Sequence, residues 1–239
     1  MPLDRRTLLI GSTAAVVAAG LAAWQFLPSG APAPSPAPPS PAPAPASTTA
    51  APAQPAPPSP PALPADDLRL SERAVGRANA PVRVIEYFSL TCSHCADFHR
   101  NTYPRVKAEL LETGRARLIF RDFPLDQIAL RVHAIARSFP AQGYEPFISA
   151  LFASQDRWAH ARGVDHKAEI GRLAALAGMP PAVFDAAWAD DALARAILES
   201  SQRGEREHNV RSTPTFVFGS RVVGGNLGFD RFAQEVAQG

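Results

Sequence analysis

The stretch of sequence that decides the fold reads PVRVIEYFSLTCSHC, residues 81–95. Its first nine residues form an apolar run rich in β-branched and aromatic side chains, which predicts a buried β-strand. Beyond Cys92 and Cys95, apolar positions recur at helical spacing as far as about Thr113, and Gly114 is the expected end of that helix. The sequence therefore places two cysteines where a strand passes into the first turn of a helix.

The chemistry expected of this stretch lies in Cys92, Ser93, His94 and Cys95. Two cysteines separated by two residues can alternate between a dithiol and a disulfide, so the Cys92–Cys95 couple needs no further cofactor. A helix N-terminus offers unpaired N–H groups and the positive end of the helix dipole, which stabilise a thiolate. We therefore expect Cys92 to be the nucleophile with a lowered pKa, and Cys95 to be the shielded thiol that resolves mixed disulfides. His94 can add positive charge or a hydrogen bond toward Cys92.

Other uses of the two cysteines fit the sequence less well. A c-type haem motif requires histidine directly after the second cysteine, and Ala96 occupies that position. Zinc could be held by Cys92, Cys95 and His99, but no second cysteine pair completes the four ligands. A purely structural disulfide would close a very short loop and stabilise the fold weakly. Five histidines are expected at helix surfaces or helix ends rather than in catalysis: His99, His133, His160, His166 and His208.

Outward from this stretch, the pattern predicts an α/β fold that carries an inserted helical subdomain. Residues 115–121 predict a second strand, which a right-handed crossover makes parallel to the first. Residues from about 126 to 208 show helical periodicity and imply four or five helices. Two short strands follow, separated by Gly219 and Ser220 as in a hairpin, before a closing helix over residues 229–236. Breaks in the helical block are expected at Pro140, Gly143, Pro180 and Pro181.

Four ordered motifs relate the chain from about Leu70 to Gln238 to a known family. They are the strand at residues 80–89, the cysteine motif, RDFPL at residues 121–125 and STPT at residues 212–215. In these motifs the chain resembles the DsbA-like thiol:disulfide oxidoreductases, which have a thioredoxin fold with a helical insertion. The resemblance implies one such domain over residues 66–239, with its insertion at about residues 126–208.

The resemblance also implies roles for three residues outside the cysteine motif. Pro214 matches the family's cis-proline, which packs against the active-site disulfide, and Thr213 would dock an extended substrate strand through its backbone groups. Glu86 matches a buried acidic residue that could shuttle the proton on Cys95 during exchange. The alternatives are an ordinary proline at the start of a strand and a solvent-facing charge at a strand edge.

The chain departs from the family pattern in two respects. Many relatives carry a second cysteine pair in the insertion, near the positions of Ser138 and Ala187, and this chain has only two cysteines. Ser93 replaces the proline that is common before the histidine. Because the dipeptide between the cysteines tunes the redox potential, the strength of the oxidant does not transfer from the family to this chain.

The first 65 residues differ from the rest in composition. Arg5 and Arg6 precede an uncharged apolar run over residues 7–27, which is typical of an export signal, here resembling the twin-arginine type, or of a membrane anchor. We interpret residues 1–27 in one of these two ways, and both leave the domain outside the cytoplasm. Residues 28–65 hold 16 of the 25 prolines and no charge, which predicts a disordered Pro/Ala-rich spacer.

Charge and motifs together lead to a functional expectation. Residues 66–239 carry 22 basic and 21 acidic side chains, a near balance that argues against an electrostatic nucleic-acid binder, which would need a clustered basic face. We expect a monomeric periplasmic enzyme, either soluble after signal cleavage or tethered through residues 7–27. It would introduce disulfides into reduced exported proteins through Cys92 and Cys95, and the resemblance implies reoxidation by a quinone-linked membrane partner. The alternatives are a periplasmic disulfide reductase or isomerase, and a metal-handling or redox-inert chaperone module.

Overall fold

The computed structural model describes residues 62–64 and 66–239. The export signal or anchor expected at residues 1–27 lies outside the described residues. The spacer expected at residues 28–65 does so as well, apart from residues 62–64. Within the described ranges, no helix has both the length and the apolar character needed to cross a membrane.

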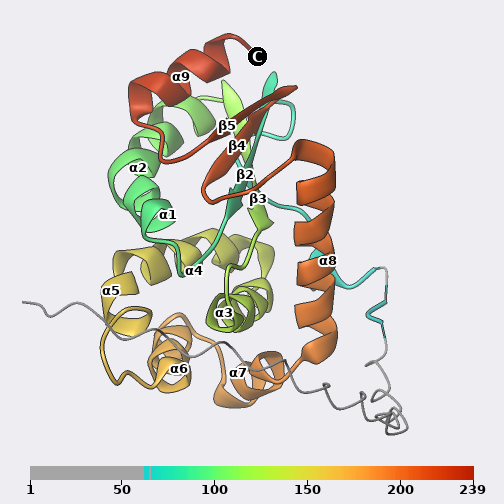
Figure 1. Cartoon of the computed structure of the whole chain (residues 1–239), viewed down its shortest axis with the longest axis vertical. Helices are drawn as coiled ribbons and strands as arrows, with labels where there is room; N and C mark the ends of the chain where they lie inside the picture. Colours follow the sequence, from blue (N-terminus) through green and yellow to red (C-terminus); the bar gives the residue numbers. More distant parts are fainter. Residues whose placement is uncertain (1–61, 65) are drawn as a thin grey trace, which may run out of the picture. The chain divides into compact units, whose positions relative to one another are not determined.

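A five-stranded mixed sheet forms the centre of the fold, in the order β1-β3-β2-β4-β5 (Figure 1). β2 (Val82–Phe88) lies in the middle, parallel to β3 (Ala116–Asp122) and antiparallel to β4 (Thr215–Phe218). β5 (Arg221–Gly224) pairs with β4, and β1 (Arg73–Val75) pairs with the outer edge of β3. The sequence predicts β2, β3 and the β4–β5 hairpin. It does not predict β1, because three residues are too few to show a strand pattern.

One helical segment joins β2 to β3 and begins at the cysteine motif. It consists of α1 (Ser93–Asp97), η2 (Phe98–Thr102), α2 (Tyr103–Val106) and η3 (Lys107–Leu111), of which η2 and η3 are π-helical. Pro104 has no N–H to donate to the preceding turn, and the wider π-type turn directly before α2 accommodates this loss. Gly114 follows the segment with φ +81°, a left-handed conformation that favours glycine at a helix end.

The insertion between β3 and β4 is built from helices. Five of them have eight residues or more, which matches the four or five expected, and one is a single turn. They are α3 (Gln127–Arg137), α4 (Ala141–Ala153), the single turn α5 (Gln155–Trp158), α6 (His166–Leu176), α7 (Pro181–Trp188) and α8 (Asp191–His208).

Capping residues and prolines set the ends of these helices. The side chains of Asp126, Asp165 and Asp190 accept backbone N–H groups at the starts of α3, α6 and α8. Pro140 and Pro180 lie directly before α4 and α7. The break expected at Gly143 is wrong, since that residue lies inside α4; a single glycine costs a helix only about 1 kcal/mol relative to alanine.

Side chains of β2 alternate between two layers of the molecule. Val84 and Phe88 belong to the main hydrophobic core, whereas Tyr87 packs in a second cluster with Phe123 and Val217. Figure 1 shows α1, α2 and α9 (Phe229–Ala237) on one side of the sheet and α8 on the other. Glu86 shares its side of the strand with Val84 and Phe88, so it faces the layer that carries the cysteine helix.

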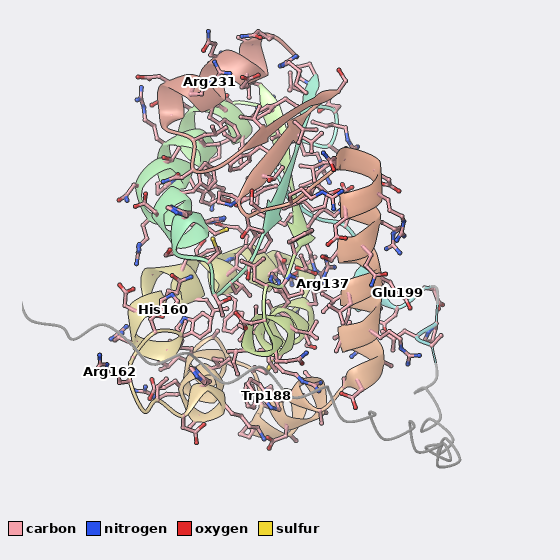
Figure 2. All side chains as sticks on the ribbon, viewed as in Figure 1. Arg137, His160, Arg162, Trp188, Glu199 and Arg231 are labelled. Atoms are coloured by element: carbon pink, nitrogen blue, oxygen red, sulfur yellow. The ribbon has the colours of Figure 1, made fainter. Side chains whose placement is uncertain are left out.

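The core fills the space between the sheet and its covering helices (Figure 2). Its largest fully buried members are mostly aromatic, and they come from β2, β3, β4, the cysteine helix, α4, α5 and α9. This continuous core confirms the α/β fold with inserted helices that the sequence predicts. It also places the carboxyl end of β2, where the cysteine motif begins, against the insertion.

Candidate active site

Cys92 lies at the junction of β2 and the cysteine helix. It is the N-cap residue of α1 with an extended backbone (φ −78°, ψ 121°), and its side chain is half-buried. Cys95, within the first turn of α1, is fully buried, and both residues are free thiols in this structure. The two cysteines therefore differ in access to solvent, as the sequence predicts for an attacking and a resolving thiol.

The loop before β4 approaches Cys92 from the other side. The Cys92 thiol donates a hydrogen bond to the carbonyl oxygen of Thr213, at a distance of 3.3 Å. The Thr213–Pro214 peptide bond is cis, as the resemblance implies. The Pro214 carbonyl accepts the Gly225 N–H at 2.8 Å, which ties this loop to the end of β5. Thr213 and Pro214 are thus brought to Cys92, although Thr213 lies 121 positions after Cys92 in the sequence.

The surroundings of the two thiols shift their acidities in opposite directions. The pKa of Cys92 is lowered to about 5, mainly by the hydrogen bond that the Cys95 thiol donates to it, against the opposing effect of burial. Backbone N–H groups of Cys95 and His94 add to this stabilisation of the thiolate. Burial raises the pKa of Cys95 well above its ordinary value, and the charges of Cys92 and Glu86 raise it further.

The dipeptide between the cysteines is on the surface. Ser93 and His94 are both exposed, at the first two positions of α1. His94 acts on Cys92 through its backbone N–H, which is one of the causes of the lowered Cys92 pKa. Both side chains remain available to an incoming molecule.

Glu86 is completely buried beneath the cysteine helix and is paired with a histidine. Its Oε1 atom lies 2.9 Å from Nε2 of His99, whose ring stacks on Phe152 with 4.3 Å between centroids. The alternative of a solvent-facing Glu86 is therefore excluded. Glu86 Oε2 and His99 Nδ1 have no hydrogen-bond partner among the described residues. The two side chains therefore form a polar pair enclosed in the core.

The expectation of surface or helix-end positions for the histidines is wrong for two of them. His99 is buried against Glu86, and His133 is fully buried with Nδ1 at 2.8 Å from Asp122. For His99 a signal existed in the sequence, because it lies one helical turn after the buried Cys95 and so on the same face. By contrast, Figure 2 shows His160 on the outside of the insertion, where it is exposed.

The zinc alternative finds no support in the geometry of the described ranges. His99 directs Nε2 to Glu86 rather than to the thiols. No group of three or more His, Cys, Asp or Glu side chains in those ranges is arranged to hold a metal ion.

Gln155 is a site residue that the sequence analysis missed. It lies in α5 of the insertion, is 0% exposed, and its Nε2 atom donates to the backbone carbonyls of Leu90 at 2.8 Å and Cys92 at 3.0 Å. No local pattern relates a glutamine to a carbonyl 63 positions earlier in the chain. The contact arises only where the insertion folds against the end of β2.

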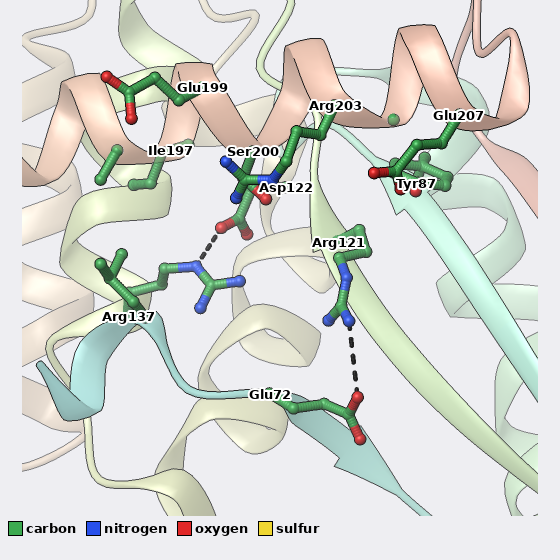
Figure 3. A pocket seen from close by; sticks show the side chains of 13 residues that line it. Glu72, Tyr87, Arg121, Asp122, Arg137, Ile197, Glu199, Ser200, Arg203 and Glu207 are labelled. Atoms are coloured by element: carbon green, nitrogen blue, oxygen red, sulfur yellow. Dashed lines mark hydrogen bonds and ion pairs between the residues drawn. The ribbon is translucent and has the colours of Figure 1, made fainter. Parts of the chain in front are cut away.

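A cavity of about 380 Å³ lies elsewhere, between α8, β2 and β3. Its lining combines three arginines with four carboxylates, and Figure 3 shows two of the resulting ion pairs, Arg137 with Asp122 and Arg121 with Glu72. The cysteines, Thr213 and Pro214 do not line it. Its charges therefore belong to the packing of α8 on the sheet and not to the cysteine site.

Comparisons with known proteins identify the family of this fold. A family model described as thioredoxin matches residues 69–237. A Rickettsia felis protein, provisionally named a protein-disulfide oxidoreductase, is 24% identical over 167 residues, which are 70% of this chain and 59% of that protein. The crystal structure of Wolbachia pipientis alpha-DsbA1 matches with TM-score 0.65 and 27% identity, covering 71% of this chain and 90% of that one. Bacillus subtilis BdbD, at 16% identity and TM-score 0.61 over 70% and 91% of the chains, shares the fold. The chain spans about 60% of the length of the curated relatives it matches.

Proposed function

The chain belongs to the thioredoxin family, in its DsbA-like branch, and from that premise we propose that it is an exported thiol:disulfide oxidoreductase that introduces disulfides into other proteins. The observation that carries the proposal is the asymmetry of the two thiols. Cys92 is accessible with a pKa lowered to about 5, whereas Cys95 is buried with a raised pKa. This asymmetry suits a couple in which Cys92 exchanges with substrate and Cys95 completes the internal disulfide.

The proposed reaction transfers a disulfide to the substrate. A substrate thiolate attacks Sγ of Cys92, forming a mixed disulfide while the Cys92–Cys95 bond breaks, and Cys95 leaves with the electron pair and takes up a proton. A second substrate thiolate then attacks the substrate sulfur of the mixed disulfide and expels the Cys92 thiolate. The substrate loses two electrons and two protons: Cys95 takes up one proton and the other passes to solvent, so the reduced enzyme carries the Cys92 thiolate and the Cys95 thiol.

The acidity of Cys92 sets the preferred direction. A thiol of low pKa is the better leaving group, so the second step releases the Cys92 thiolate readily. Stabilising this thiolate stabilises the reduced enzyme, which makes the oxidised enzyme a stronger oxidant. The low pKa of Cys92 therefore favours a disulfide donor over a reductase.

The proposal assigns the remaining site residues as follows. The buried Glu86–His99 pair would supply and accept the proton on Cys95, because the Glu86 charge already acts on that thiol. Thr213 and Pro214 would dock an extended stretch of substrate beside Cys92. Ser93 and His94 would meet the substrate at the surface.

Localisation and partners complete the proposal. The enzyme would act in the periplasm on reduced exported proteins, and a membrane partner linked to quinone would reoxidise it. The composition of residues 1–27 supports export or tethering, and the relatives with disulfide-exchange names support the class of partner.

Equilibration in glutathione redox buffers, followed by thiol trapping, tests the assignment. We expect a reduction potential well above that of the cellular glutathione pool. A potential near that of thioredoxin, about −270 mV, would overturn the disulfide-donor assignment in favour of a reductase. Cys92→Ser should abolish exchange in both cases.

A further inference from the structure

The helical insertion contacts the backbone of the nucleophile through Gln155. One amide nitrogen donates to two carbonyls, Leu90 O at 2.8 Å and Cys92 O at 3.0 Å, and thereby uses both of its N–H groups. We infer that Gln155 is a positioning residue for the reaction at Cys92: it holds the Leu90–Cys92 backbone in the orientation that stabilises the thiolate.

The orientation of this backbone matters because the thiolate is stabilised by the helix that starts there. The Cys92 carbonyl also accepts the Ala96 N–H at 3.1 Å, and the Cys92 N–H donates to Ser89 O at 3.2 Å. The backbone N–H groups of His94 and Cys95 contribute to the lowered pKa of Cys92, and their placement relative to Sγ depends on Cys92 keeping its N-cap conformation at the start of α1. Rotation of the Cys92 peptide would misalign these donors.

The corner between α4 and α5 holds Gln155 in place. The Ser154 hydroxyl donates to the Ala150 carbonyl at 2.8 Å, and the Trp158 indole donates to the Leu151 carbonyl at 2.8 Å. Trp158 is itself fully buried. Because Ser154 and Trp158, on either side of Gln155, are both anchored to α4, the Gln155 amide has little freedom to turn away from the carbonyls of Leu90 and Cys92.

Two carbonyl oxygens accept at this contact, so the side chain at position 155 must supply two N–H donors, as an amide does. Oε1 of Gln155 is buried without a hydrogen-bond partner in the described part of the chain, so the polar contacts of this side chain pass through its NH₂ group. A flipped amide would direct its oxygen at two carbonyl oxygens, and an ionised glutamate would add a charge there. Methionine has nearly the same shape but no N–H donor. The Gln155→Met variant therefore removes the two hydrogen bonds and keeps the packing of the side chain.

The test compares the full-length reduced protein with its Gln155→Met variant. The titration of Cys92 is followed by the ultraviolet absorbance of the thiolate and by the rate of alkylation with iodoacetamide. We expect the pH midpoint to rise by about half a unit to one unit, which lowers the alkylation rate at the wild-type midpoint by about two- to fivefold. Gln155→Asn, whose shorter side chain cannot span both carbonyls, is a second variant and should shift the midpoint in the same direction.

Two controls separate positioning from general destabilisation. Ile170→Ala, at a fully buried site in α6 of the same insertion, should lower the melting temperature without moving the midpoint. Gln202→Met, at an exposed position of α8, should change neither the melting temperature nor the Cys92 titration midpoint. An unchanged midpoint in both Gln155 variants would overturn the inference.

The inference rests on the proposed function only in taking Cys92 as the reacting thiol. The titration needs no substrate and no redox partner. A thioredoxin-like reduction potential would therefore overturn the disulfide-donor assignment and leave the role of Gln155 standing. An unchanged Cys92 titration midpoint in the Gln155 variants would overturn the role of Gln155 and leave the disulfide-donor assignment standing.

Discussion

At the scale of single residues, the active site depends on how two chemically identical thiols are made unequal. Cys92 is the half-buried N-cap of α1 and Cys95 is buried one turn later. The hydrogen bond between them stabilises a thiolate at Cys92, and burial suppresses one at Cys95. Each residue therefore sets the acidity of the other.

Removing Cys95 should make Cys92 less acidic. In Cys95→Ala the largest cause of the lowered Cys92 pKa is lost, so the midpoint of Cys92 alkylation should rise from near 5 by about one to two units. Alkylation rates measured across pH, with the modified cysteine identified by mass spectrometry, check this. Cys95→Ser keeps a donor and should shift the midpoint less. Equal midpoints for wild type and Cys95→Ala would contradict the prediction.

The Glu86–His99 pair should show separate structural and chemical roles. His99→Phe keeps an aromatic ring against Phe152 but leaves the Glu86 carboxylate buried without its partner, at an expected cost of about 1–3 kcal/mol in unfolding free energy. The double variant Glu86→Leu with His99→Phe should recover most of this loss, because an apolar pair replaces both polar groups.

The rate of disulfide exchange tests the chemical role of the Glu86–His99 pair separately from its effect on stability. Both variants should exchange disulfides more slowly than wild type, by up to about a hundredfold, if the pair moves the proton on Cys95. Urea denaturation gives the stability and stopped-flow exchange with a thiol peptide gives the rate. A double variant that regains the wild-type rate together with stability would show that the pair is structural only.

At the scale of elements, the packing of α8 on the sheet depends on a glycine. Gly204 lies inside α8, and a Cβ atom there would meet the ring of Tyr87 at 2.4 Å. The ring is also held by its hydroxyl, 3.0 Å from Nδ1 of His208. The helix can approach β2 this closely only because position 204 has no side chain.

Two glycine-to-alanine substitutions should therefore have opposite effects. Gly204→Ala should destabilise the protein by about 1–3 kcal/mol, because the crowding outweighs the better helix propensity of alanine. Gly143→Ala, inside α4 with only ordinary contact to Phe139 at 3.4 Å, should stabilise it by about 0.5–1 kcal/mol. Thermal unfolding of both variants is the measurement, and a stabilised Gly204→Ala would refute the close-packing argument.

At the scale of the whole molecule, a buried polar network joins the N-terminal part of the described domain, the sheet and the insertion. Arg137 of α3 pairs with Asp122 of β3, which also accepts the Tyr144 hydroxyl at 3.1 Å. Arg137 donates to the carbonyls of Arg69 at 2.9 Å and Ser71 at 3.2 Å. The network fastens the segment before β1 to the rest of the domain.

This network should contribute to acid sensitivity. Burial opposes ionisation of Asp122, but the charges of Arg137 and His133 outweigh it and lower the Asp122 pKa. A lowered carboxyl pKa contributes stability that is complete above the unfolded-state value of about 3.9 and is lost as the pH falls below it. Wild-type stability should therefore fall with pH in this range.

Asp122→Asn tests the prediction. At neutral pH it should cost about 3–5 kcal/mol, because Arg137 is left buried without a counter-charge. Below about pH 4 the difference from wild type should begin to narrow, because the unfolded wild-type chain then binds a proton at Asp122 that the folded protein does not bind. Urea denaturation of both proteins from pH 3 to pH 7 measures the difference in their unfolding free energies. A difference that stays constant across this range would assign the acid sensitivity to other groups.

Much of the fold and part of the site could be predicted because their signals are local. The apolar run of β2, the helical spacing after Cys92 and the Gly219–Ser220 turn depend on neighbouring residues alone. Pro214 was predicted by resemblance, and its position beside Cys92 needed the folded chain. β1 was missed because its three residues gain their strand conformation from pairing with β3.

The sequence by itself determined the reacting group: two cysteines at the start of a helix, whose N-terminus favours a thiolate. Only the tertiary structure decided what surrounds that group. His99 meets Glu86 because a helix packs on a strand, and Gln155 reaches Cys92 because the insertion folds against the end of β2. A buried polar group must find its hydrogen-bond partner wherever the chain brings one, and periodicity in sequence describes which face is buried but not which distant residue meets it.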